Sequence, residues 1–77
     1  MKYNNITINP ALMNGQPCIR GLRLTVRRVV ELVAIYSDRT ELFKEYPELQ
    51  EEDIRQALLY TATYLDDQIL EFHETAA

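Results

Sequence analysis

Four arginines lie close together in the N-terminal part of the chain: Arg20, Arg23, Arg27 and Arg28. A guanidinium group is permanently charged and presents a rigid fork of N–H donors, which pairs well with a phosphate or a carboxylate. Residues 1 to 30 contain five basic residues and no acid, whereas the remainder contains twelve acids and three bases. This asymmetry predicts a basic contact surface for nucleic acid or for an acidic protein, on an otherwise acidic molecule.

Each of these arginines also has a purely structural interpretation. Arg27 can pair with Glu31 one helical turn further on, which contributes only about 0.2–0.5 kcal/mol, and Arg28 can remain solvated. Arg20 and Arg23 can instead stabilise the fold by contacting the acidic C-terminal part. The sequence leaves the binding interpretation and the structural interpretation of these two residues equally open.

Residues that would support catalysis or metal binding are sparse. The chain has one His and one Cys, and no spacing typical of a catalytic triad or a metal site. Cys18 is expected to be a small buried hydrophobe. The carboxylates at 51–53 and 66–67 are better explained as a helix-dipole partner and a solvated face, because neighbours on a helix point in different directions. We therefore expect a binding protein rather than an enzyme, with no metal ion and no cofactor.

The elements that position the arginines fit a single domain of residues 1–77. Residues 1–24 are expected to be extended, because Ile6 and Ile8 alternate with polar neighbours. Three residues that favour turns interrupt this segment and have a structural role: Gly15, Pro17 and Gly21. We expect the extended pieces to pair, within one chain or across a dimer, because a lone short strand leaves its backbone groups unmatched.

Three helices are expected after this segment. The first spans 25–36 with Thr25 as its N-cap, the second spans 39–46 after Asp38, and the third spans 51–72. The first helix has apolar positions at helical spacing: Val26, Val29, Val30 and Val33. The third has a longer apolar stripe: Ile54, Ala57, Leu58, Ala62, Leu65, Ile69 and Phe72. The fold class is therefore predicted to be mainly α, a trihelical, homeodomain-like helix-turn-helix with a short N-terminal β-strand pair and a long C-terminal helix.

The end of the third helix extends beyond what a core of this size needs. It would expose an apolar surface unless a partner covered it: Leu65, Ile69, Leu70 and Phe72. A homodimer through this surface is expected, and a chain of 77 residues would gain stability from it. The sequence has neither a signal peptide nor an apolar run long enough to span a membrane, so we expect a cytoplasmic protein with no membrane partner.

Two stretches, NGQPCIRGLRLTV and YPELQEEDIRQALLYT, resemble a small bacterial domain family of unknown function, family four-three-three. The matching positions in the first stretch are Gly15, Pro17, Ile19, Gly21, Arg23 and Val26. Those in the second are Tyr46, Pro47, Leu49, Asp53, Ile54, Ala57, Leu58 and Tyr60. The sequence departs from the family pattern at Leu22, where Thr is usual, and at Gln50, where Ser or Thr commonly caps the third helix.

The family is similar to VapB-type antitoxins, which are often encoded beside a PIN-like nuclease toxin. The resemblance implies an antitoxin of a type II toxin–antitoxin pair that neutralises this nuclease and represses its own operon by binding operator DNA. The acids at the start of the third helix would face phosphates, so the segment 15–28 is expected to contact any DNA, doubled by dimer symmetry. The alternative is a helix-turn-helix-shaped protein–protein interaction module that binds no nucleic acid.

Overall fold

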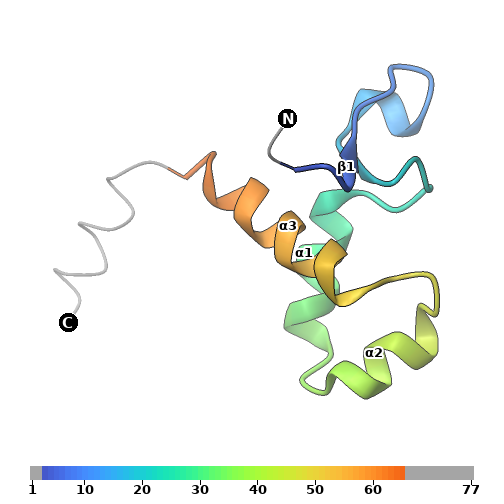
Figure 1. The fold of residues 1–77 in the computed structure, drawn as a ribbon, viewed down its shortest axis with the longest axis vertical. Helices are drawn as coiled ribbons and strands as arrows, with labels where there is room; N and C mark the ends of the chain where they lie inside the picture. The colour runs from blue at the N-terminus through green and yellow to red at the C-terminus, as the bar shows by residue number, and fades with distance from the viewer. Residues whose placement is uncertain (1–2, 66–77) are drawn as a thin grey trace, which may run out of the picture.

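The structure is a computed structural model, and it describes residues 3–65 (Figure 1). Its elements follow one another in this order: β1 (Ile6–Thr7), the short 3₁₀ helix η1 (Met13–Gly15), β2 (Cys18–Ile19), α1 (Val26–Ile35), α2 (Arg39–Glu45) and α3 (Glu51–Ala62). The predicted fold class, three helices with a short N-terminal strand pair, is confirmed.

The two short strands pair within one chain, which answers the question that the sequence left open. β1 and β2 are antiparallel, with Ile6 opposite Ile19 and Thr7 opposite Cys18. The other edge of β2 is occupied as well, because Cys18 bridges to Thr25 and the Ile19 N–H donates to a backbone carbonyl at 2.9 Å. The extended segment is thus a small sheet that leads directly into α1.

Two turns with positive φ shape this segment. Gly15 has φ of 79° at the end of η1, directly after Asn14 with φ of 58°. Gly21 has φ of 73° and follows Arg20, which has φ of 45°. The Leu22 N–H donates to the Ile19 carbonyl at 2.7 Å across this second turn. The successive positive φ values of Arg20 and Gly21 are those of a type I′ turn, in which glycine avoids the steric cost that a side chain causes.

α1 begins where the sequence predicts, and the Oγ1 of Thr25 accepts the Arg28 N–H at 3.0 Å as an N-cap. The helix ends at Ile35, within a residue of the expected end. Its buried face is turned relative to the predicted one: Val29 and Leu32 are buried, whereas Val30 and Val33 are only half-buried. The predicted spacing omitted Leu32 because the valines alone fit a helical period.

α2 and its connection to α3 also follow the sequence closely. The Asp38 carboxylate accepts the Thr40 N–H at 2.8 Å at the start of α2. The helix ends at Glu45, because the residue before Pro47 is disfavoured in helical geometry. Leu42 is its contribution to the core and is fully buried.

α3 differs from the prediction in its end and in its buried face. The helix stops at Ala62 instead of continuing to residue 72, and Ile69, Leu70 and Phe72 lie outside the described residues. The hydroxyl of Thr63 donates to the Tyr60 carbonyl at 2.6 Å. Side-chain bonds of this kind compete with the helical ladder, and β-branched residues weaken it further. The predicted length of this helix is therefore wrong over residues 63–65.

The buried face of α3 contains two polar residues that the apolar stripe did not include. Its buried side chains are Asp53, Ile54, Gln56, Ala57 and Tyr60. Leu58, which the predicted stripe placed in the core, is 39% exposed. Leu65, which was expected in an interface and not in the core, is 55% exposed.

The core lies between α1 and α3, which cross in Figure 1, with α2 and the strand pair at its sides. Cys18 is buried in it, as expected, and burial raises the pKa of its thiol. Within residues 3–65, none of the helices has the length and apolar character needed to cross a membrane.

Candidate functional site

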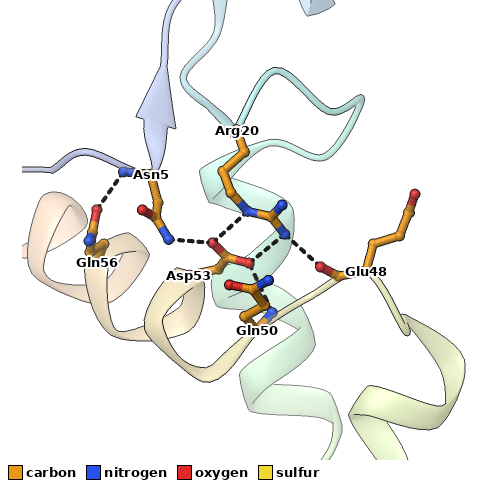
Figure 2. A network of polar contacts seen from close by, with 6 residues as sticks. All are labelled: Asn5, Arg20, Glu48, Gln50, Asp53 and Gln56. Carbon is orange, nitrogen blue, oxygen red and sulfur yellow. Dashed lines mark hydrogen bonds and ion pairs between the residues drawn. The ribbon is translucent and has the colours of Figure 1, made fainter.

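Arg20 and Asp53 form the central ion pair of a polar network that joins the sheet to α3 (Figure 2). The Nε and Nη2 atoms of Arg20 donate to the two carboxylate oxygens of Asp53 at 3.1 and 3.0 Å. The same Nη2 also donates to the Glu48 carbonyl at 2.6 Å. The Asp53 side chain is fully buried, whereas that of Arg20 is 34% exposed. The two-point contact fixes the guanidinium in one orientation.

Two further donors satisfy the buried carboxylate. Asn5 Nδ2 donates to Asp53 Oδ1 at 2.7 Å, and the Gln50 N–H donates to Oδ2 at 2.9 Å. The second bond is half of a capping box, which compensates for the missing Ser or Thr at residue 50. Gln56 Oε1 accepts the Asn5 N–H at 2.8 Å and extends the network along α3 (Figure 2).

The network sets the protonation state of Asp53. Burial by itself would raise the pKa of this carboxyl group. Hydrogen bonds from Arg20, from the Gln50 N–H and from Asn5 outweigh burial and lower the pKa below its ordinary value of 3.8. Asp53 is therefore charged at neutral pH although no part of it faces solvent.

The lowered pKa of Asp53 predicts a specific loss of stability in acid. The unfolded chain takes up the proton first, so the stabilisation is fully present above pH of about 4 and is lost as the pH falls through the folded-state pKa. Denaturant midpoints measured at a series of pH values from 7 downward should decrease once the pH drops below about 4. In Asp53→Asn the fall should be shallower, whereas Glu51→Gln, which alters an exposed acid of the same helical turn, should leave it unchanged. Equal slopes in all three proteins would contradict the assignment.

The other three arginines gather around a shallow hollow at the start of α1. The hollow has a volume of about 360 Å³ and is lined mainly by polar groups, with Arg23, Arg27 and Arg28 at its edges. The rest of the lining comes from Met13, Gln16, Leu24, Thr25 and Glu31. We call it the arginine hollow. The structure thus brings together three of the four predicted contact residues and places Arg20 in the internal ion pair instead.

Ion pairs inside the arginine hollow are weak. Arg27 and Arg28 approach Glu31 at 3.7 and 3.3 Å, and their side chains are 82% and 47% exposed. Exposed pairs of this kind contribute roughly 0–1 kcal/mol. Hydrogen bonding with Tyr46, and then with Glu31, raises the pKa of Arg28 above its ordinary value. One carboxylate is thus shared by two guanidinium groups at a helix N-terminus that is itself partly positive.

An apolar groove adjoins the arginine hollow on the other side of Arg27 and Glu31. It has a volume of about 520 Å³ and lies between the start of α1 and the end of α3. Its apolar lining comes from five residues: Pro17, Val26, Val30, Tyr60 and Tyr64. The Tyr64 hydroxyl donates to that of Tyr60 at 3.0 Å, and this bond together with burial raises the pKa of Tyr60. We call this feature the α1–α3 groove.

Asp53 is the residue whose role the sequence interpretation missed. The sequence pattern predicts a helix-dipole role for it together with Glu51 and Glu52, yet it is the buried member of an ion pair. A signal was present, because residues 53, 56, 57 and 60 share one helical face with spacing i, i+3, i+4, i+7. Two of the four residues are polar, so a search for apolar residues at helical spacing does not find this face. No comparable signal marks Asn5, which reaches α3 only through the fold.

The described residues contain no cluster of three or more His, Cys, Asp or Glu side chains that would hold a metal ion. The arrangement that remains is a basic hollow beside an apolar groove, supported by a buried ion pair.

Comparison with known proteins gives a match to a protein family. Neither a curated protein sequence nor a solved structure matches the chain. The family described as "Protein of unknown function (DUF433)" matches residues 6–61, a range that includes both turns, α1, α2, all but the last residue of α3 and the Arg20–Asp53 pair. Since this range is most of the chain, the protein belongs to the DUF433 family.

Proposed function

We propose that this protein is an antitoxin of a type II toxin–antitoxin pair, which binds and neutralises a PIN-like ribonuclease. The observation that carries the proposal is the arginine hollow, in which Arg23, Arg27 and Arg28 converge from the loop before α1 and from its first turn. The resemblance of the sequence to VapB-type antitoxins supports the choice of partner. Cytoplasmic action and the absence of enzymatic activity are parts of the same proposal.

The chemistry of the hollow fits an acidic protein surface. PIN-like nucleases hold their metal ions with clustered carboxylates, and a guanidinium fork pairs with such groups in two-point geometry. Among the described residues, the carboxylate that pairs with Arg27 and Arg28 is that of the exposed Glu31. A carboxylate cluster on a partner can replace this weak pairing at little cost in stability. Arg20 remains on Asp53 and holds the segment that carries Arg23.

A first test compares charge reversals on the two sides of the molecule. In the double variant Arg23→Glu/Arg27→Glu, the affinity for a co-expressed PIN-like nuclease should fall about thirtyfold or more, because removing one side of a desolvated charge pair costs about 2–5 kcal/mol. The matched control is Arg55→Glu, an exposed arginine of α3 whose partner is Glu52 at 3.1 Å. Isothermal calorimetry and inhibition of RNA cleavage give the readouts. Equal decreases in both variants would mean that the arginine hollow is not the binding surface.

Operator DNA is the second partner we propose, and the distribution of charge favours the same hollow over α3. The first turn of α3 carries the exposed acids Glu51 and Glu52, which repel phosphate, whereas the arginine hollow attracts it. A homodimer would present the hollow twice, as a palindromic operator requires.

The salt dependence of DNA binding distinguishes an operator-binding protein from the alternative, a protein–protein interaction module that binds no nucleic acid. Replacing Arg23 and Arg27 by Gln should reduce the slope of log K against log salt by about 0.9 for each phosphate that the protein no longer neutralises. Arg20→Gln should not reduce it, because Arg20 is paired with Asp53. Gel shifts of upstream DNA over a salt series provide the measurement. An unchanged slope in the double variant, or no binding at all, would favour the interaction module.

A further inference from the structure

The α1–α3 groove is an apolar surface at the point where the described chain ends. It is lined by Val26 and Val30 of α1, by Tyr60 of α3 and by Tyr64 just after the end of α3. Tyr64 is 71% exposed, and Leu65 beside it is 55% exposed. Large exposed apolar side chains next to an apolar groove indicate an interaction surface.

The charged residues at the groove point to the chemistry of its occupant. Arg27 stands on the rim that the groove shares with the arginine hollow, and its side chain is 82% exposed. Glu31 is the acid on the same rim. An occupant that combines apolar side chains with acidic ones would bury the first in the groove and bring the second to the arginines.

The sequence of this chain contains such a segment directly after the groove. Residues 66–77 read DDQILEFHETAA, with three large apolar residues and four acids. No basic residue other than a single His occurs in these twelve positions. The apolar and acidic side chains therefore match the groove and its basic rim in kind.

The position of this segment favours a second copy as its source. Tyr64 already lines the groove, so residues 69–72 of the same chain would have to reverse direction within residues 65–68, a stretch without glycine or proline. A second copy needs no such reversal. Two copies related by a twofold axis would exchange these segments, so that each groove receives the segment of the other chain.

We propose that the α1–α3 groove of one copy binds residues 66–77 of a second copy, with Ile69, Leu70 and Phe72 in the groove and the acids at Arg27. In this exchange each chain contributes its groove and its residues 66–77 to the interface, and the resulting dimer is the homodimer of the proposed function. It concerns self-association alone, so the experiment contains no nuclease and no DNA, and its failure would leave the toxin and operator tests standing.

The experiment is intermolecular paramagnetic broadening between two forms of the full chain. One form carries a nitroxide on Ala76→Cys and no isotope, and the other carries labelled methyl groups and no added cysteine. In an equal mixture, the methyl signals of Val26 and Val30 should broaden, while those of Leu42 in α2 should remain sharp. Light scattering should give the mass of a dimer. The native Cys18 is buried, and a chain without the added cysteine checks that it takes up no nitroxide.

Two matched triple variants of the spin-labelled chain test the role of the apolar side chains. Ile69→Asp/Leu70→Asp/Phe72→Asp should abolish the broadening and reduce the mass to that of a monomer. Gln68→Asp/His73→Asp/Thr75→Asp also adds three carboxylates to the segment but leaves the apolar residues in place. This variant should retain both the broadening and the mass of a dimer.

Three results would overturn the proposal. The first is a mixture in which Val26 and Val30 stay sharp. The second is broadening that persists when the spin-labelled chain carries Ile69→Asp/Leu70→Asp/Phe72→Asp. The third is broadening seen only when nitroxide and labelled methyl groups are on the same chain, diluted with unlabelled protein, which would assign the groove to the segment of its own chain.

Discussion

Replacing Asp53 with alanine is expected to lower the free energy of unfolding by about 3 kcal/mol, the lower end of the range for breaking a buried ion pair, because the Arg20 side chain left behind is 34% exposed. The substitution takes away the acceptor for Arg20, for Asn5 and for the Gln50 N–H at once. A domain of this length has a total stability of about 4–12 kcal/mol. The variant should therefore lose a large share of this stability, and its urea midpoint, followed by circular dichroism, should lie far below that of the parent protein.

Two companion variants separate the ion pair from a mere helix-dipole effect. Glu51→Ala removes an exposed acid from the same helical turn, one that pairs with Arg39 at 3.2 Å, and should cost at most about 1 kcal/mol. Arg20→Lys keeps the positive charge and loses the two-point fork, so its urea midpoint should lie between those of the parent and Asp53→Ala. If Asp53→Ala and Glu51→Ala cost the same, Asp53 would be only a dipole partner.

The second large effect is expected at Ile54, where truncation to alanine should cost about 2–5 kcal/mol. The Ile54 side chain is fully buried in the core. Alanine leaves a cavity there that the surrounding α1 side chains fill only in part, so packing is lost together with the transfer free energy. Thermal and urea unfolding would measure the loss.

Leu58→Ala is the control one helical turn along, and it tests the orientation of α3. Leu58 is 39% exposed, so its truncation should cost about 1 kcal/mol at most. The apolar stripe read from the sequence placed both residues in the core and predicts similar losses. A loss at Leu58 that matches the loss at Ile54 would support the stripe, or place Leu58 in an interface.

Features that depend on a few neighbouring residues were predictable from the sequence. The helix starts at Thr25 and Asp38 follow from side chains that accept nearby backbone N–H groups. The positive φ at Gly15 and Gly21 follows from turn chemistry in the same way. These interactions span at most a few residues, so the local sequence contains most of the information that specifies them.

Features that depend on the tertiary fold were not predictable in this way. The orientation of α3 is set by Asp53 and Gln56, which are buried because Arg20 and Asn5 reach them from 33 to 51 residues away. A hydropathy pattern treats both as surface residues. The end of α3 at Ala62 is a related case, because the apolar spacing continues beyond the point where the threonines interrupt the backbone ladder.

The same distinction between local features and features of the tertiary fold applies to the candidate site. The concentration of arginines was visible in the sequence, and so were two interpretations of Arg20. Only the fold shows that Arg20 turns inward to Asp53 while Arg23, Arg27 and Arg28 surround one hollow. The α1–α3 groove had no sequence signal, because it arises where two helices diverge.

The backbone at Arg20 places two opposing demands on a single position. Its φ of 45° belongs to the left-handed region, which disfavours residues other than Gly, Asn and Asp by about 1–2 kcal/mol. The ion pair with Asp53 requires a long side chain with a guanidinium group. Among the twenty amino acids no residue satisfies both demands, so a saturation library at this position, sorted for folded protein, should return arginine first and glycine or asparagine next. The set of residues that position 20 accepts thus shows whether the stabilisation from the ion pair exceeds the steric cost of a side chain at this positive φ.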